Sequence, residues 1–149
     1  MELTGTRLIA ADRATVWAAL NDPDTLRACI PGCQELSGSA DEGFEATVVQ
    51  KVGPVKATFK GAVKFEDVNA PVSYRIIGEG KGGAAGFAKG DAAVSLAETP
   101  EGTELTYAVN AKVGGKLAQL GSRIVDGFAK KMADKFFEDF KNHVEGAEA

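Results

Sequence analysis

The C-terminal part of this chain carries a helical pattern that limits the folds the chain can adopt. Over residues 116–144, apolar side chains recur at steps of three or four, which places them in one row along a helix. The row is Leu117, Leu120, Ile124, Phe128, Met132, Phe136, Phe140 and Val144. Residues 34–113 have instead the pattern of strands separated by turns. One apolar helix that follows a set of strands can bury its row only against a face of the sheet.

The strands before this helix have one wet face and one buried face. The clearest alternation runs over 55–66, where apolar residues such as Phe59 and Val63 alternate with polar ones such as Lys60 and Lys64. Near the N-terminus, Asp12 and Asp22 are expected to cap two short helices, the second starting at Pro23. We therefore expect an α+β fold: a strand, two short helices, six further strands and the long helix, with a curved antiparallel sheet of about seven strands wrapped around that helix.

The inward face of this sheet is predicted to be unusually hollow. Alternation assigns nine small side chains to it: Ala46, Ala57, Gly61, Gly78, Gly80, Ala88, Gly90, Ala92 and Ala111. Protein interiors contain few voids larger than a water molecule, so the space must be filled. Two interpretations remain open. Aromatic side chains fill the space while the glycines let the strands bend, or a cavity persists and binds an apolar ligand.

The composition excludes several classes of function. The chain has 149 residues, the usual size of one domain, and a net charge of −4, which argues against a nucleic-acid binder. Its first residues lack the pattern of a secretion signal, and no run of 18 apolar residues occurs, so a cytoplasmic protein is expected. Cys29 and Cys33 have three residues between them, whereas zinc knuckles and redox pairs have two. With His143 as the single histidine, the sequence predicts neither a metal site nor a redox pair.

Six motifs, in this order, resemble the G-subunit family of carbon monoxide dehydrogenase. They are LNDP at 20–23, CIPGC at 29–33, KVGPVK at 51–56, GEGK at 78–81, AGFAKG at 85–90 and VGGKLAQLGSR at 113–123. The resemblance spans about residues 2–143. It implies the helix-grip fold of the START and birch-pollen-allergen (SRPBCC) superfamily, here as a single domain over 1–149. It also implies a non-catalytic accessory role beside molybdenum-containing dehydrogenases of the carbon monoxide dehydrogenase type, with membrane recruitment and a quinone or lipid-like ligand.

The first functional hypothesis is accordingly a carrier that binds an apolar molecule, has no cofactor, and works in the cytoplasm or at the inner face of the cell membrane. The predicted cavity residues are Trp17, Phe44, Val48, Gln50, Phe59, Tyr107, Leu120, Ile124, Phe128 and Met132. Two alternatives remain: a ligand-free assembly factor for the dehydrogenase, or an enzyme of the cyclase or hydrolase kind. The enzyme would need an acid or base inside the cavity, and Tyr107 is the only good candidate.

The helical row also predicts where the ligand lies. Because the row steps mostly by four, it winds slowly around the helix axis. Residues 117–136 are expected to cover the cavity, with the ligand beneath 120–132. Phe140 and Val144 then point elsewhere, toward the edge of the domain, a partner or a membrane surface.

Overall fold

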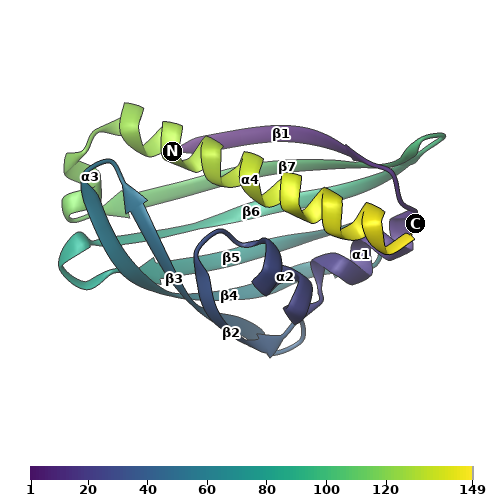
Figure 1. Cartoon of the computed structure of the whole chain (residues 1–149), viewed down its shortest axis with the longest axis horizontal. Helices are drawn as coiled ribbons and strands as arrows, with labels where there is room; N and C mark the ends of the chain where they lie inside the picture. Colours follow the sequence, from purple (N-terminus) through teal and green to yellow (C-terminus); the bar gives the residue numbers. More distant parts are fainter. Residues whose placement is uncertain (149) are drawn as a thin grey trace.

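The expected order of elements is confirmed (Figure 1). The computed structural model describes the backbone of residues 1–148 and side chains through Gly146, so Ala149, the last residue of the expected domain, lies outside the described part. The elements are β1 (Glu2–Ile9), α1 (Arg13–Leu20), α2 (Pro23–Cys29), β2 (Cys33–Ser39), β3 (Gly43–Val52), β4 (Val55–Asn69), β5 (Ser73–Lys81), the 3-10 turn η1 (Gly83–Ala85), β6 (Phe87–Thr99), β7 (Gly102–Gly114), α3 (Lys116–Gln119) and α4 (Ser122–Glu148).

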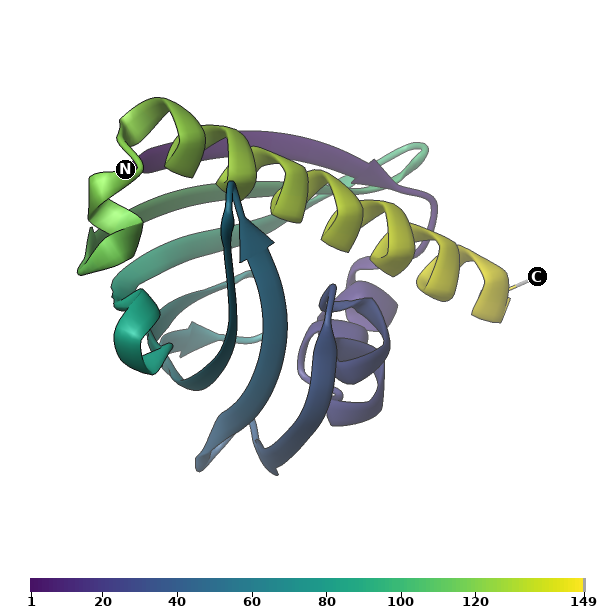
Figure 2. The same ribbon diagram turned by 60° about the vertical axis from the view of Figure 1, so that its left-hand side comes forward.

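The seven strands form one antiparallel sheet in the order β1-β7-β6-β5-β4-β3-β2. The sheet curves, and α4 lies across its inner face, so that β3 rises beside the helix on one side and β1 lies beside it on the other (Figures 1 and 2). No helix within residues 1–148 has both the length and the apolar content that crossing a bilayer requires.

The two short helices begin where the sequence predicts. The Asp12 carboxylate accepts a hydrogen bond from the Thr15 backbone N–H at 2.8 Å. The Asp22 carboxylate accepts from both the backbone N–H and the hydroxyl of Thr25, at 3.3 and 2.7 Å. His143 on α4 reaches the same hydroxyl, with its Nε2 3.3 Å from Thr25 Oγ1. Because the hydroxyl donates to Asp22, the histidine is the donor in this contact. The cap therefore also joins α2 to α4.

The Asp22 cap makes a testable contribution to stability. The hydrogen bond from the Thr25 hydroxyl is the main cause that lowers the pKa of Asp22. Replacing Asp22 by alanine is expected to cost about 1 kcal/mol at neutral pH, the usual worth of an N-cap. Since the folded pKa is depressed, this contribution is present above the unfolded value of about 3.9 and is lost as pH falls through the folded value. Denaturant titrations across the acid range should show the wild type and the Asp22→Ala variant converging.

Asparagine is the matched control, because it caps a helix as well as aspartate but does not titrate. The Asp22→Asn variant should stay close to the wild type at neutral pH and keep a constant advantage over Asp22→Ala in acid. If Asp22→Asn and Asp22→Ala lost the same amount of stability at neutral pH, the negative charge of Asp22, and not its cap, would stabilise α2.

The long terminal helix differs from the sequence prediction near its start. The expected helix over 116–144 is divided into α3 and α4 by Gly121, which has a φ of +89° in the left-handed region. That conformation ends α3 and changes the phase of the next helix. Val125 is therefore buried, whereas Ile124 is 42% exposed. The predicted row was wrong at Ile124 because it assumed an unbroken helix.

The prediction for the last turns of the helix was also wrong. Phe140 and Val144 are 0% and 2% exposed and belong to the main core. They are buried because α1 and α2 fold beneath this half of α4 and pack with it over one end of the sheet. The core comprises Ile9, Ala11, Val16, Leu20, Cys29, Tyr74, Val94, Leu96, Leu105, Tyr107, Phe140 and Val144. The first half of α4 thus faces a different environment from the second.

Candidate functional site

An apolar cavity of about 420 Å³ lies between the first half of α4 and the inner face of the sheet. It is lined by Met1 and by residues from β1, β3, β4, β5, β6, β7, α3 and α4. These are Met1, Leu3, Val48, Gln50, Val52, Phe59, Gly80, Ala88, Val109, Ala111, Val113, Leu117, Val125, Phe128, Ala129, Met132 and Ala133. None of these side chains is charged, and Gln50 has the only polar one. The cavity is within the range of 300–1,000 Å³ that is usual for small-molecule sites.

Small residues on the sheet produce this hollow. Gly80, Ala88 and Ala111 form part of its floor, and a Cβ atom added to Gly80 would have no atom within 4 Å. A second depression of about 300 Å³ shares these three residues and continues along the sheet to Val63 and Ile76. Aromatic side chains therefore leave this part of the inner face unfilled. Six of the nine predicted inward positions line the two hollows: Gly78, Gly80, Ala88, Gly90, Ala92 and Ala111.

One end of the cavity is closed by turns and not by sheet. Val52, Leu117 and Val125 are its buried lining residues, and they come from the β3–β4 hairpin, α3 and α4. At the hairpin tip, a Cβ atom built on Gly53 would lie 3.3 Å from Ile124 Cγ2. The hairpin therefore touches the α3–α4 junction by side-chain packing across this end.

Five of the ten predicted residues line the cavity, and they come from three elements: Val48, Gln50, Phe59, Phe128 and Met132. The other five lie elsewhere. Trp17 packs edge-on against Tyr74 with ring centroids 5.2 Å apart, and Phe44 packs against Phe65 at 5.6 Å. Leu120 and Ile124 lie at the hairpin contact on the outside of the cavity wall.

Tyr107 is in the packed core next to the cavity. Its ring stacks on Phe137 at 5.0 Å, and its hydroxyl accepts a hydrogen bond from Arg7 Nη2 at 3.2 Å. The same Arg7 nitrogen donates to Asp134 Oδ1 at 2.6 Å, which ties β1 to α4 and lowers the pKa of Asp134. The only residue proposed as an acid or base is thus directed away from the cavity. The lining contains no Asp, Glu, His or Tyr.

Gln50 contributes its stem to the wall, while its amide has a structural partner. The side-chain nitrogen donates to the Pro31 carbonyl in the connection between α2 and β2. The Gln50 amide nitrogen is therefore used to hold the connection between α2 and β2 against β3, and a direct bond from it to a ligand is less well supported. Among the described residues, no three His, Cys, Asp or Glu side chains are close enough together to bind a metal ion.

The sequence prediction missed one wall of the cavity. Leu3 on β1 and Val109 and Val113 on β7 line it, as do Ala129 and Ala133 on α4. The alternation within β7 places Val109, Ala111 and Val113 on one face, so the signal was present. What the local pattern lacked was the pairing of β1 with β7, which brings Leu3 opposite Val109.

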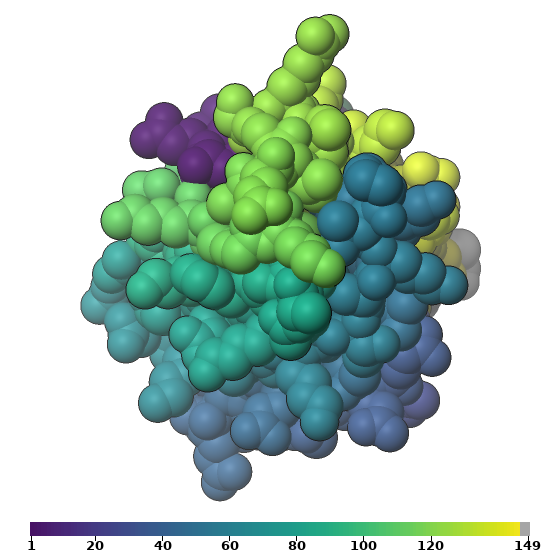
Figure 3. Space-filling model, turned by 90° about the vertical axis from the view of Figure 1, so that its left-hand side faces the viewer, coloured from purple at the N-terminus to yellow at the C-terminus, as the bar shows by residue number. Residues whose placement is uncertain are grey.

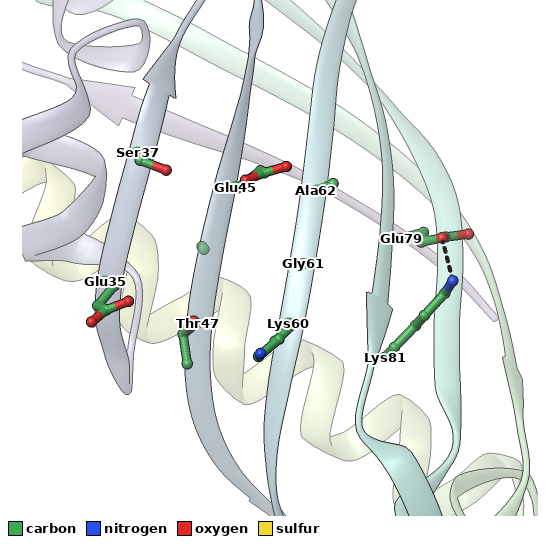
Figure 4. Close-up of a pocket in the computed structure, with 10 residues that line it drawn as sticks. Glu35, Ser37, Glu45, Thr47, Lys60, Gly61, Ala62, Glu79 and Lys81 are labelled. Carbon is green, nitrogen blue, oxygen red and sulfur yellow. Dashed lines mark ion pairs between the residues drawn. The ribbon is translucent and has the colours of Figure 1, made fainter.

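A hollow of similar volume, about 440 Å³, lies on the outer face of the sheet, over β2 to β5 (Figure 4). Its lining is polar and mixed in charge, with Glu35, Glu45, Lys60 and the ion pair between Glu79 and Lys81 at 3.4 Å. Such a lining is typical of a solvated sheet face, so the apolar inner cavity is the better candidate site.

The structure is similar to solved proteins of the same architecture. A conserved protein from Geobacillus kaustophilus has 28% sequence identity and a TM-score of 0.91, covering 99% of this chain and 97% of its own. A protein from Thermus thermophilus has 15% identity and a TM-score of 0.72, with both chains fully covered. An AHSA1-like protein from Aeromonas hydrophila has 21% identity and a TM-score of 0.62, covering 99% of this chain and 94% of its own.

The sequence comparison is more specific than the structural ones. No curated protein matches the chain significantly. The family profile of the carbon monoxide dehydrogenase G subunit (CoxG) matches residues 5–145, which is nearly the whole chain and confirms the resemblance carried by the six motifs. The chain therefore belongs to the CoxG family, the G-subunit family of carbon monoxide dehydrogenase.

Proposed function

We propose that this protein is a non-catalytic accessory protein that carries an apolar ligand, such as a quinone or a lipid, in the cavity beneath α4. The observation that supports this most directly is the wall of the cavity, which offers apolar surface from eight elements and no charged side chain. A ligand held there is selected by its shape and its apolar surface. A polar head group would have to remain at the cavity's opening or find water.

The size of the cavity supports an occupied state. If it were empty and dry, a cavity of 420 Å³ would cost about 10 kcal/mol at roughly 24 cal/mol per Å³. That is comparable with the whole stability of a domain, about 5–15 kcal/mol. The space is therefore filled by water or by an apolar molecule. Displacing poorly held water from an apolar wall favours binding.

The family supports the accessory role. The family name describes a subunit of carbon monoxide dehydrogenase, which supports a molybdenum-containing dehydrogenase of that type as the partner. The carrier supplies or removes an apolar electron carrier and helps to recruit the enzyme to the membrane, where such molecules are dissolved. A cyclase or hydrolase is less well supported, because no acid or base lines the cavity. A ligand-free assembly factor has no need for a hollow of this size.

Replacing Phe128 by aspartate tests the carrier function. Phe128 lines the cavity, so a carboxylate there places a charge against apolar surface. The affinity for an apolar ligand should fall by about five- to 150-fold, since an unpaired polar group costs about 1–3 kcal/mol. Calorimetric titration with decylubiquinone measures the effect. The wild type purified from its native host, extracted with organic solvent and analysed by mass spectrometry, should yield a stoichiometric apolar molecule.

Ile124→Asp is the matched control, because Ile124 lies one turn from Phe128 on α4 but is 42% exposed and outside the lining. This variant should bind decylubiquinone like the wild type. Normal binding by a folded Phe128→Asp variant, or no extractable ligand together with no decylubiquinone binding by the wild type, would refute the carrier function.

A further inference from the structure

One end of the molecule carries an excess of cations although the chain has a net charge of −4. Because the sheet is antiparallel, the β3–β4 hairpin, η1, α3 and the start of α4 all lie at the same end of the strands, and Figure 3 shows them side by side on one face. We call this face the basic end. Its cations flank or lie within these turns: Lys51, Lys56, Lys81, Lys112, Lys116 and Arg123.

These cations have few partners within the protein. In the described part of the chain, only Lys81 forms an ion pair, with Glu79. Lysines face each other directly across the ladder at Lys51 and Lys56 and again at Lys89 and Lys112. Like charges directly opposite each other destabilise a sheet. Glu79 lies opposite Lys89 in the next ladder, but no acidic residue lies opposite Lys51 or Lys56. The repulsion at the hairpin is therefore uncompensated within the sheet and points to an external anionic partner.

The opposite end of the molecule is acidic. The turns there contain Asp12, Asp41, Glu42 and Glu101, and the strand ends beside them contain Glu66, Asp67 and Glu98. The charge is therefore separated along the strands and not spread evenly over the surface. A protein whose charges are separated in this way approaches an anionic surface with its basic end first.

The basic end also exposes apolar side chains. Ile124 and Phe87 are 42% and 41% exposed, and Pro54 at the hairpin tip is exposed as well. The cavity lies directly behind them, because Val52 precedes the hairpin turn, Leu117 follows Lys116 and Val125 follows Ile124 in the cavity wall. Packing of Ile124 and Leu120 near Gly53 joins the hairpin to the helix at this end.

We propose that the basic end is a docking face for an anionic lipid surface, and that the apolar ligand passes between lipid and cavity there, where the β3–β4 hairpin meets the α3–α4 junction. The passage of ligand rests on the proposed carrier function, whereas the docking does not. Lysines close to an anionic bilayer each add to the attraction, and apolar side chains between them can enter the interface.

A lipid surface fits this end better than an acidic protein. The cations come from several separate turns that surround exposed apolar side chains, which is the pattern of an interfacial surface. The location of the cavity behind the same turns gives an apolar ligand a short path from a bilayer. An acidic protein surface would match the charges but would give no role to this path.

Flotation with vesicles tests the docking face. The wild type should bind phosphatidylglycerol-rich vesicles at low salt and not pure phosphatidylcholine vesicles, and the binding should fall as salt screens the charges. The double variant Lys51→Gln/Lys56→Gln should lose about fivefold in affinity for each lysine removed. Ile124→Asp should also weaken docking, because it removes an apolar contact and adds a negative charge.

The double variant Lys135→Gln/Lys141→Gln is the control, because it removes the same charge from the second half of α4. It should float like the wild type, as should Phe128→Asp. Decylubiquinone binding in solution should be unchanged in the Lys51→Gln/Lys56→Gln variant, so failure of docking is distinguishable from failure of the carrier function. Absence of flotation by the wild type, or equal losses in both double variants, would overturn the proposal. Loss of dehydrogenase binding in the Lys51/Lys56 variant, without any flotation by the wild type, would assign the face to a protein.

Discussion

Replacing Phe140 by alanine is expected to lower the free energy of unfolding by about 3–5 kcal/mol, the usual cost of truncating a buried aromatic side chain. Phe140 is 0% exposed and its ring stacks on Phe136 at 5.7 Å. It belongs to the same buried cluster as Val16 of α1 and Cys29 of α2, so α1, α2, the sheet and the second half of α4 share it. The change removes a large part of the stability of a domain of this size.

Denaturant unfolding followed by circular dichroism measures the loss, and Phe140→Leu should show a smaller one because less volume is removed. Ile124→Ala is the control on the same helix. Its side chain is 42% exposed, so its truncation should cost less than about 1 kcal/mol. If Phe140→Ala cost no more than Ile124→Ala, the second half of α4 would not be anchored in the core as the structure has it.

The strands could be predicted from the sequence because their signal is local. Alternation at a period of two identifies the wet and buried faces without knowledge of the partner strands, and it places Gly80, Ala88 and Ala111 on the inward face correctly. The caps at Asp12 and Asp22 are equally local, since each depends on a residue three positions later. These features determine the order of elements and the hollow floor of the sheet.

The cavity wall was harder to predict because it depends on one backbone angle and on distant pairing. The left-handed conformation of Gly121 breaks the helix and brings Val125, not Ile124, to the cavity. Leu3 reaches the wall only because the first strand pairs with the last. Phe140 was misplaced for a related reason, since the docking of α1 and α2 beneath α4 is tertiary and has no counterpart in helical periodicity.

Replacing Gly80 by valine is expected to fill part of the cavity, with opposite effects on stability and on binding. A Cβ atom at Gly80 meets nothing within 4 Å, and valine suits a strand better than glycine. The free energy of unfolding should therefore rise by about 1 kcal/mol, from the buried methyl groups and the stiffer backbone. Decylubiquinone binding should weaken by about five- to 150-fold, because overpacking a site costs about 1–3 kcal/mol.

Gly90→Val is the contrasting variant on the neighbouring strand. Its Cβ would collide with the Asn110 carbonyl oxygen, so the backbone must move and stability should fall. The collision at Gly90 is with β7 beside it, so this variant shows the cost of a valine that the sheet itself cannot accept, whereas Gly80 has free space. A stabilised Gly80→Val variant that no longer binds decylubiquinone would show that the space above Gly80 is reserved for a ligand at the expense of stability. If Gly80→Val were destabilised like Gly90→Val, side chains would already occupy that space, and the carrier function would lose its site.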